Sequence, residues 1–145
     1  QMKEGKKVKY LIMVSHGQFA EGLKDALSML AGQREDVLAL GLQNGKSADE
    51  FAEEFSNIIN PICQDDEIIL LGDLIGGSPL TTAMNVVSEK GLHCTIIGGM
   101  NLPLALTTVL MKDTMSTNDL VVQILNEATT ALRELKIEND EDEDI

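Results

Sequence analysis

The sequence predicts an α/β fold in which a doubly wound, mainly parallel open sheet of four strands carries helices on both faces. Strand-like apolar runs alternate with amphipathic helical patterns, which is typical of βαβ units with right-handed crossovers. The run 68–71 is apolar at four successive positions, as in a strand buried on both faces. Asp73, two glycines and the pair Ser78-Pro79 follow it. This pattern predicts a turn in which Ser78 caps a helix that begins at Pro79.

The first half of the chain supplies two strand–helix units. Residues 10–14 form the first strand, which ends at Ser15-His16-Gly17, and apolar residues at helical spacing then predict a helix that stops before Gly32. Residues 37–42 form the second strand. Ser47, with Glu50 three positions later, is a capping box that opens the next helix.

The second half continues the alternation. A helix over 79–90 is expected to turn Ala83, Met84 and Val87 inward, and residues 93–97 form the fourth strand. One helix should follow through Met111, and a last one should fade after Leu132. Residues 132–137 fit either the end of that helix or a short strand that covers a sheet edge by antiparallel pairing. In a doubly wound sheet the first and third strands are neighbours, which gives the order 2-1-3-4.

Composition places these elements in one domain, residues 8–137, between a polar extension (1–7) and an acidic tail (138–145) that we expect to be disordered. The formal net charge of −13 disfavours nucleic acid and anionic membranes as partners. Without a membrane-spanning run or a signal-peptide pattern, a cytoplasmic protein is expected. The two cysteines, Cys63 and Cys94, lack metal-ligand spacing and are expected to be buried thiols.

The candidate chemistry lies at the carboxyl ends of the first and third strands. A histidine at a strand end is by itself more often structural, but the predicted topology brings His16 and Asp73 into one crevice. A carboxylate that accepts one ring N–H leaves the other ring nitrogen free as a nucleophile. Glycines 17, 76 and 77 and the helix start at Ser78 could bind a phosphoryl group. Because no nucleotide loop or metal cluster is present in the sequence, we expect a phosphohistidine carrier that needs no cofactor or metal.

Three motifs together resemble enzyme IIA of the mannose class (mannose/fructose/sorbose) of the bacterial phosphoenolpyruvate-dependent sugar phosphotransferase system. They are Ser15-His16-Gly17, the segment 72–79 (Gly-Asp-Leu-Ile-Gly-Gly-Ser-Pro) and the segment 98–103 (Gly-Gly-Met-Asn-Leu-Pro). The resemblance implies that His16 accepts a phosphoryl group from phosphorylated HPr and passes it to enzyme IIB for coupled sugar uptake and phosphorylation. It implies that Asp73 orients the His16 ring and that Ser78 lies beside the phosphoryl group.

The resemblance also implies a homodimer whose chains exchange residues 132–137 as an edge strand, and only indirect contact with membrane components. Because the chain ends in acids rather than in an Ala-Pro-rich linker, it implies a separate IIA polypeptide. Three alternatives stay open. They are a receiver-like module phosphorylated on Asp73, a non-catalytic ligand-binding module, and the phosphoryl donor subunit for dihydroxyacetone kinase. The transported sugar is not encoded in a carrier of this kind.

Overall fold

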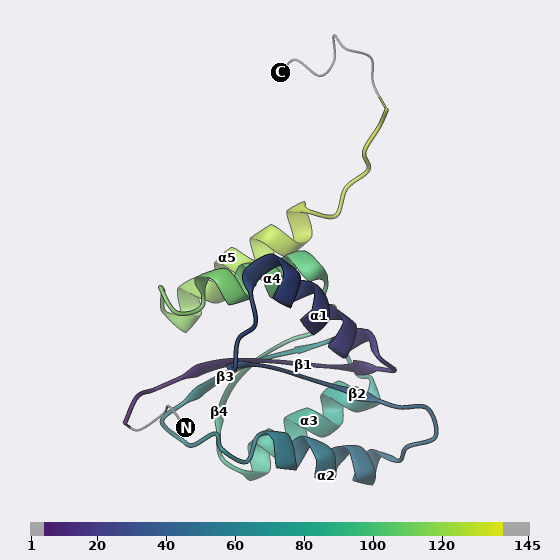
Figure 1. Cartoon of the computed structure of the whole chain (residues 1–145), viewed down its shortest axis with the longest axis vertical. Coiled ribbons are helices and arrows are strands. Elements are labelled where there is room, and N and C mark those ends of the chain that lie inside the picture. Colours follow the sequence, from purple (N-terminus) through teal and green to yellow (C-terminus); the bar gives the residue numbers. More distant parts are fainter. Residues whose placement is uncertain (1–4, 138–145) are drawn as a thin grey trace.

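The computed structural model describes residues 5–137, which contain four strands and five helices (Figure 1). The elements in chain order are β1 (Lys9–His16), α1 (Phe19–Ala31), β2 (Val37–Leu42), α2 (Ala48–Ile58), β3 (Glu67–Gly72), α3 (Ser78–Glu89), β4 (His93–Ile97), α4 (Leu102–Met111) and α5 (Thr117–Thr130).

All four strands are parallel, and their order across the sheet is β2-β1-β3-β4. The predicted α/β class and strand order are therefore confirmed. Val14 of β1 lies opposite Gly72, the last residue of β3, while β1 continues to His16 along its pairing with β2. This register brings the ends of β1 and β3 together at the carboxyl edge of the sheet, where ligand sites of doubly wound folds are found.

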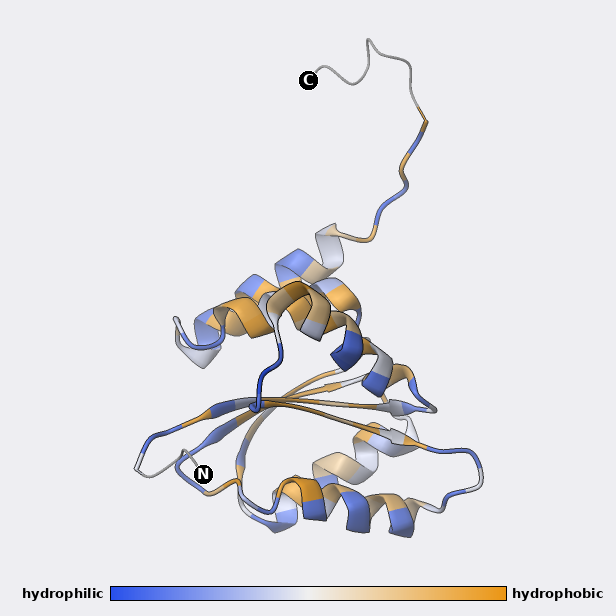
Figure 2. Ribbon diagram, in the orientation of Figure 1, coloured by the Kyte–Doolittle hydropathy of each residue, from blue (hydrophilic) through white to orange (hydrophobic). Residues whose placement is uncertain are grey.

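Two layers of helices cover the sheet. Helices α1, α4 and α5 lie on one face, and α2 and α3 lie on the other (Figure 1). Successive side chains of a strand point to opposite faces, so Leu11 and Met13 enter one core while Ile12 and Val14 enter the other. Figure 2 shows apolar residues along the strands and polar residues on the outward side of α2. The sheet is buried on both faces, which accounts for the continuous apolar runs in the sequence.

Side chains cap three of the helices. The capping box of α2 is confirmed, because the Ser47 hydroxyl accepts from the Glu50 N–H and the Glu50 carboxylate accepts from the Ser47 N–H. Asn101 caps α4 with a single bond, in which its side-chain oxygen accepts from the Leu104 N–H at 2.8 Å. Ser116 caps α5, where its side-chain oxygen accepts from the Asp119 N–H.

The predicted cap of α3 is wrong. Gly77 is the N-cap, and Ser78 is the first helical residue, so its hydroxyl makes no capping bond. The reason lies in the preceding turn. Gly76 takes a positive φ of 83°, the Gly77 N–H donates to the Leu74 carbonyl at 3.3 Å, and Gly77 emerges in the extended conformation that a cap requires. The start of α3 is thus left without a side-chain cap.

Two burial predictions are also wrong. Met84 is 38% exposed, because α3 turns its Ala83 and Val87 positions toward the sheet and leaves Met84 at the side. Cys63 is exposed, in the loop between α2 and β3, where its thiol contacts the Asp66 carboxylate at 3.4 Å. Cys94, in β4, is half-buried, and burial raises the pKa of its thiol to about 12.

Residues 132–137 have neither of the two predicted structures in a single chain. Helix α5 ends at Thr130, and the segment that follows is exposed without regular secondary structure, including Leu132, Leu135 and Ile137. Pairing with a second chain stays a prediction. The acidic segment 138–145 lies outside the described residues. Within residues 5–137, no helix has both the length and the apolar character to cross a membrane.

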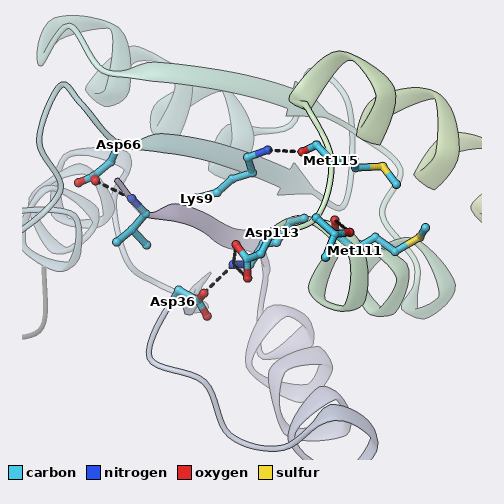
Figure 3. A network of polar contacts seen from close by, with 9 residues as sticks. Lys9, Asp36, Asp66, Met111, Asp113 and Met115 are labelled. Atoms are coloured by element: carbon cyan, nitrogen blue, oxygen red, sulfur yellow. Dashed lines mark hydrogen bonds and ion pairs between the residues drawn. The ribbon is translucent and has the colours of Figure 1, made fainter. Parts of the chain in front are cut away.

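A buried lysine connects helix and strand at the amino edge of the sheet. The Lys112 side chain, just past α4, is fully buried, and its Nζ lies 2.6 Å from Asp36 and 3.3 Å from Asp113. Figure 3 shows both carboxylates together with Lys9, whose Nζ donates to the Met115 carbonyl at 3.1 Å. These contacts stabilise the edge of the sheet where the strands begin, whereas His16 lies at the edge where they end.

Candidate functional site

His16 is the last residue of β1 and stands at the carboxyl edge of the sheet. Its side chain is 48% exposed, in contrast to the six residues before it in the strand, all of which are buried. The chain then turns at Gly17, which takes a positive φ of 56°, and enters α1 two residues later. The buried strand β1 thus holds the His16 main chain in place while the imidazole is exposed at the surface.

Asp73 follows the last residue of β3 and meets His16 across the edge. One carboxylate oxygen, Oδ2, accepts from the His16 main-chain N–H and from ring Nδ1, each at 2.9 Å. The other oxygen, Oδ1, accepts from the Leu74 N–H at 2.9 Å. The structure therefore brings together the two residues that the topology predicted to converge.

These contacts set the charge of the carboxyl. Burial on its own raises the pKa of Asp73, but the hydrogen bonds from the His16 main chain and ring, the electrostatic attraction to that ring and the Leu74 N–H together hold the pKa below its ordinary value. Asp73 is consequently ionised at neutral pH and acts only as an acceptor.

The tautomer of His16 follows from that charge. A carboxylate cannot donate, so ring Nδ1 must carry the shared proton, and Nε2 of the neutral ring then holds a lone pair. Nε2 makes no hydrogen bond to the residues that the structure describes. The exposed ring thus has one nucleophilic nitrogen, and the bond between Nδ1 and Asp73 fixes its orientation.

The turn from Leu74 to Gly77 lies against the ring of His16. A Cβ atom placed on Gly77 would lie 2.9 Å from Cε1 of His16, so only glycine allows the ring its position. Cε1 lies between the two ring nitrogens, so this edge of the ring borders Gly77, the N-cap of α3. Main-chain N–H groups at an uncapped helix start favour anions.

The third glycine motif, at the end of β4, supports this turn. The Met100 N–H donates to the Gly72 carbonyl at 2.9 Å, which ties the loop after β4 to the residue before Asp73. A Cβ atom on Gly98 would lie 2.2 Å from Cγ1 of Ile75, so Gly98 leaves room for this side chain. Ile75 is nevertheless 83% exposed, which places an apolar group at the surface beside the site.

Sequence reasoning missed the parts played by Ser15 and Ile75. Ser15 is fully buried and bonds to the main chain on both sides of the turn, and only its place directly before His16 hinted at this. Ile75 stands out in the sequence as an apolar residue between an acid and two glycines, but its packing on Gly98 is a long-range contact.

No metal site accompanies these residues. Among the described residues, no three His, Cys, Asp or Glu side chains form a group that could hold a metal ion. A cleft of about 760 Å³ is bordered by α1, by β2, by the loop that joins them and by Val109 of α4, and its lining includes neither His16 nor Asp73. The His16 side chain is half-exposed, which suits a partner protein better than an enclosed small molecule.

Comparison with known proteins identifies the family. Residues 10–125 match the model of the EIIA-man family, described as "PTS system fructose IIA component". The chain belongs to this family. A sorbose-specific EIIA component from Klebsiella pneumoniae is 30% identical over 77% of this chain and 80% of its own length. The mannose-specific EIIAB component of Escherichia coli K12 is 27% identical over 88% of this chain, and the match spans only 41% of that relative.

Solved structures of EIIA proteins share the architecture. A PTS IIA protein associated with the fucose utilization operon of Streptococcus pneumoniae is 28% identical and superposes with a TM-score of 0.76, covering 88% of this chain and 93% of that one. The phosphotransferase-system interpretation is therefore confirmed at the level of the family, and the alternative functions are not favoured.

Proposed function

We propose that the chain is a phosphocarrier of a sugar phosphotransferase system, with His16 as the residue that is phosphorylated. The observation that carries the proposal is the contact of 2.9 Å between Nδ1 of His16 and Asp73, which leaves Nε2 unbonded in a side chain that is 48% exposed. Family membership supplies the reaction class, since the EIIA components act in phosphoryl transfer.

The transfer step follows from this geometry. The Nε2 lone pair attacks the phosphorus of the phosphohistidine on phosphorylated HPr, a P–N bond forms at His16, and the P–N bond of the donor breaks so that its electron pair returns to the donor ring. The His16 ring gains positive character as the bond forms, and the Asp73 carboxylate at Nδ1 stabilises that charge. Enzyme IIB then takes the group by the same step in reverse.

The turn beside the ring would hold the phosphoryl oxygens. Gly17, Gly76, Gly77 and Ser78 are the residues that we assign to this role. Support comes from the contact of Gly77 with the ring and from the uncapped start of α3, where main-chain N–H groups and the helix dipole favour a dianion. The Ser78 hydroxyl makes no capping bond within its own helix and is thus available to the group.

Protein partners fit the surface around His16. Phe19, Leu74 and Ile75 are exposed apolar residues that follow the two site residues closely in the chain. Exposed apolar groups beside a reactive atom favour docking of another protein. HPr as donor and enzyme IIB as acceptor are the partners that we propose, with a cytoplasmic location and membrane components engaged only through IIB. The dihydroxyacetone kinase donor is less favoured, because the relatives named above are sugar phosphotransferase components.

The receiver alternative conflicts with the contacts of Asp73. Both carboxylate oxygens already accept hydrogen bonds from N–H groups, three in all, which lowers the nucleophilicity that an acceptor aspartate needs. The free nucleophile at this edge is the imidazole.

The test is phosphorylation by phosphoenolpyruvate, enzyme I and HPr. Wild-type protein should take up one phosphoryl group that is stable in alkali and labile in acid, and His16→Ala should take up none. His93→Ala is the matched control, because His93 lies at the amino end of β4, away from the site, and its loss should leave labelling unchanged. Label that survives in His16→Ala, or that hydroxylamine removes, would refute the proposal.

A further inference from the structure

The hydroxyl of Ser15 joins the two ends of the turn that carries His16. Its Oγ accepts from the Ala20 N–H at 2.7 Å and donates to the His16 carbonyl at 3.0 Å, and the residue is fully buried. One side chain therefore binds the last carbonyl of β1 and an early N–H of α1.

This bond replaces an ordinary helix cap. Gln18 occupies the N-cap position of α1 but makes no side-chain capping bond. The first N–H groups of a helix need acceptors from outside the helix, and here a strand residue provides one. The start of α1 is thus tied to β1 through Ser15, across the residues that form the turn.

The main chain of His16 is consequently held at both of its polar groups. Its N–H donates to Asp73 and its carbonyl accepts from Ser15, while the next N–H, of Gly17, donates to the Leu42 carbonyl at 2.8 Å. With the backbone fixed, only rotation about the side-chain bonds can move the ring. The bond between Nδ1 and Asp73 restrains that rotation.

We propose that Ser15 is a positioning residue for phosphoryl transfer, which holds the His16 backbone so that the ring meets Asp73 through Nδ1 and presents Nε2. The proposal rests on the proposed function for its kinetic part. It concerns the unphosphorylated ring as well, because the tautomer that Asp73 selects depends on the same geometry.

Three substitutions of Ser15 distinguish the effect of the hydroxyl group from the effect of side-chain volume. Ser15→Ala removes the hydroxyl. Ser15→Thr keeps it and adds a methyl group, and Ser15→Val adds the same bulk without the hydroxyl. Circular dichroism checks that each variant folds. The readouts are the rate of transfer from phosphorylated HPr and the nitrogen chemical shifts of the His16 ring in the unphosphorylated protein.

The expected pattern is a rate loss of about tenfold to a hundredfold in Ser15→Ala and Ser15→Val, the size that a displacement of about 1 Å produces, with recovery in Ser15→Thr. KM for phosphorylated HPr should stay unchanged, because a fully buried side chain cannot touch the partner. The ring spectrum should show an increased share of the Nε2–H tautomer in the two variants without the hydroxyl.

Three results would overturn the positioning role. They are a wild-type rate and ring spectrum in Ser15→Ala, equal behaviour of the Thr and Val variants, and a rate loss without any change in the ring nitrogens, which would show a merely structural bond. If wild-type protein took up no phosphoryl group, the proposed function would fail. The ring spectra would still decide whether Ser15 sets the tautomer.

Discussion

A methyl group added at Gly77 should displace the ring of His16. In Gly77→Ala the new Cβ would lie 2.9 Å from Cε1, where ordinary carbon contacts are about 3.5 to 4 Å. Gly77 has a φ of −77° and a ψ of 156°, a conformation that alanine adopts without strain, so the contact with the ring is the main cost of the substitution.

The displacement has a predictable size. The ring must retreat by about 0.5 to 1 Å, and it cannot do so without lengthening the bond of 2.9 Å between Nδ1 and Asp73. A misplacement of about 1 Å in an active site costs about a hundredfold in rate, or about 2.7 kcal/mol of activation free energy. We therefore expect transfer from phosphorylated HPr to slow by about 10- to 100-fold in Gly77→Ala, with little loss of stability.

Quench-flow transfer kinetics and the nitrogen spectrum of the ring measure the effect, and substitutions at two other glycines, Gly76 and Gly22, serve for comparison. Gly76→Ala has open space for its Cβ but a φ of +83°, so it should lose about 1 to 2 kcal/mol of unfolding free energy through backbone strain. Gly22→Ala, within α1 and also in open space, should stabilise the helix by about 1 kcal/mol and leave transfer unchanged. A Gly77→Ala variant with wild-type kinetics and an unshifted ring would refute the close packing.

Further predictions concern the carboxylate, the buried lysine and the chain end. Asp73→Asn should slow phosphoryl transfer by orders of magnitude with an unchanged circular dichroism spectrum, because an amide does not fix the tautomer as a carboxylate does. The lowered pKa of Asp73 contributes stability above about pH 4 that is lost as pH falls through the folded-state pKa, so urea midpoints of wild type and Asp73→Asn should converge in acid. Asp36→Asn should lower the unfolding free energy by about 3 kcal/mol in urea denaturation, the lower end for a broken buried pair, since Asp36 is partly exposed while Lys112 is not. Light scattering should give a dimer mass for the full chain and a monomer mass for a chain that ends at Ala131.

Each of these has a contrary outcome. Wild-type transfer in Asp73→Asn would remove the orienting role, and urea midpoints that stay equally far apart from pH 7 to pH 2.5 would contradict the lowered pKa. An unchanged urea midpoint in Asp36→Asn would show that Asp113 alone satisfies Lys112. A full-length chain that is monomeric at micromolar concentration, or a truncated chain that still dimerises, would refute the exchange of residues 132–137.

The α/β class and the order of the strands could be predicted from the sequence alone. Strands β2 and β4 have the predicted bounds, because apolar runs between turn residues leave little freedom in where a buried strand begins and ends. The convergence of His16 and Asp73 followed from topology, since the carboxyl ends of adjacent parallel strands meet at one edge.

What sequence reasoning missed depends on single dihedral angles and on contacts distant in the chain. The cap of α3 shifted to Gly77 because Gly76 turned the backbone one residue earlier than a Ser-Pro pattern suggests. The packing of Ile75 on Gly98 joins two loops that only the folded sheet brings together. In the dimer that we predict, the conformation of residues 132–137 would depend on a second chain, and a single sequence does not encode where such a partner lies.

The exposure of a single ring nitrogen has a consequence for the order of events. Asp73 bonds to both Nδ1 and the main-chain N–H of His16, so rotation of the ring is restricted. A partner can therefore reach Nε2 from one direction only. If His16 is the phosphorylated residue, as we propose, donor and acceptor must both approach Nε2 in that direction, so they cannot bind the carrier together. The phosphoryl group would then stay on His16 between two separate encounters, and transfer should follow ping-pong kinetics in which each partner competes with the other for the same face.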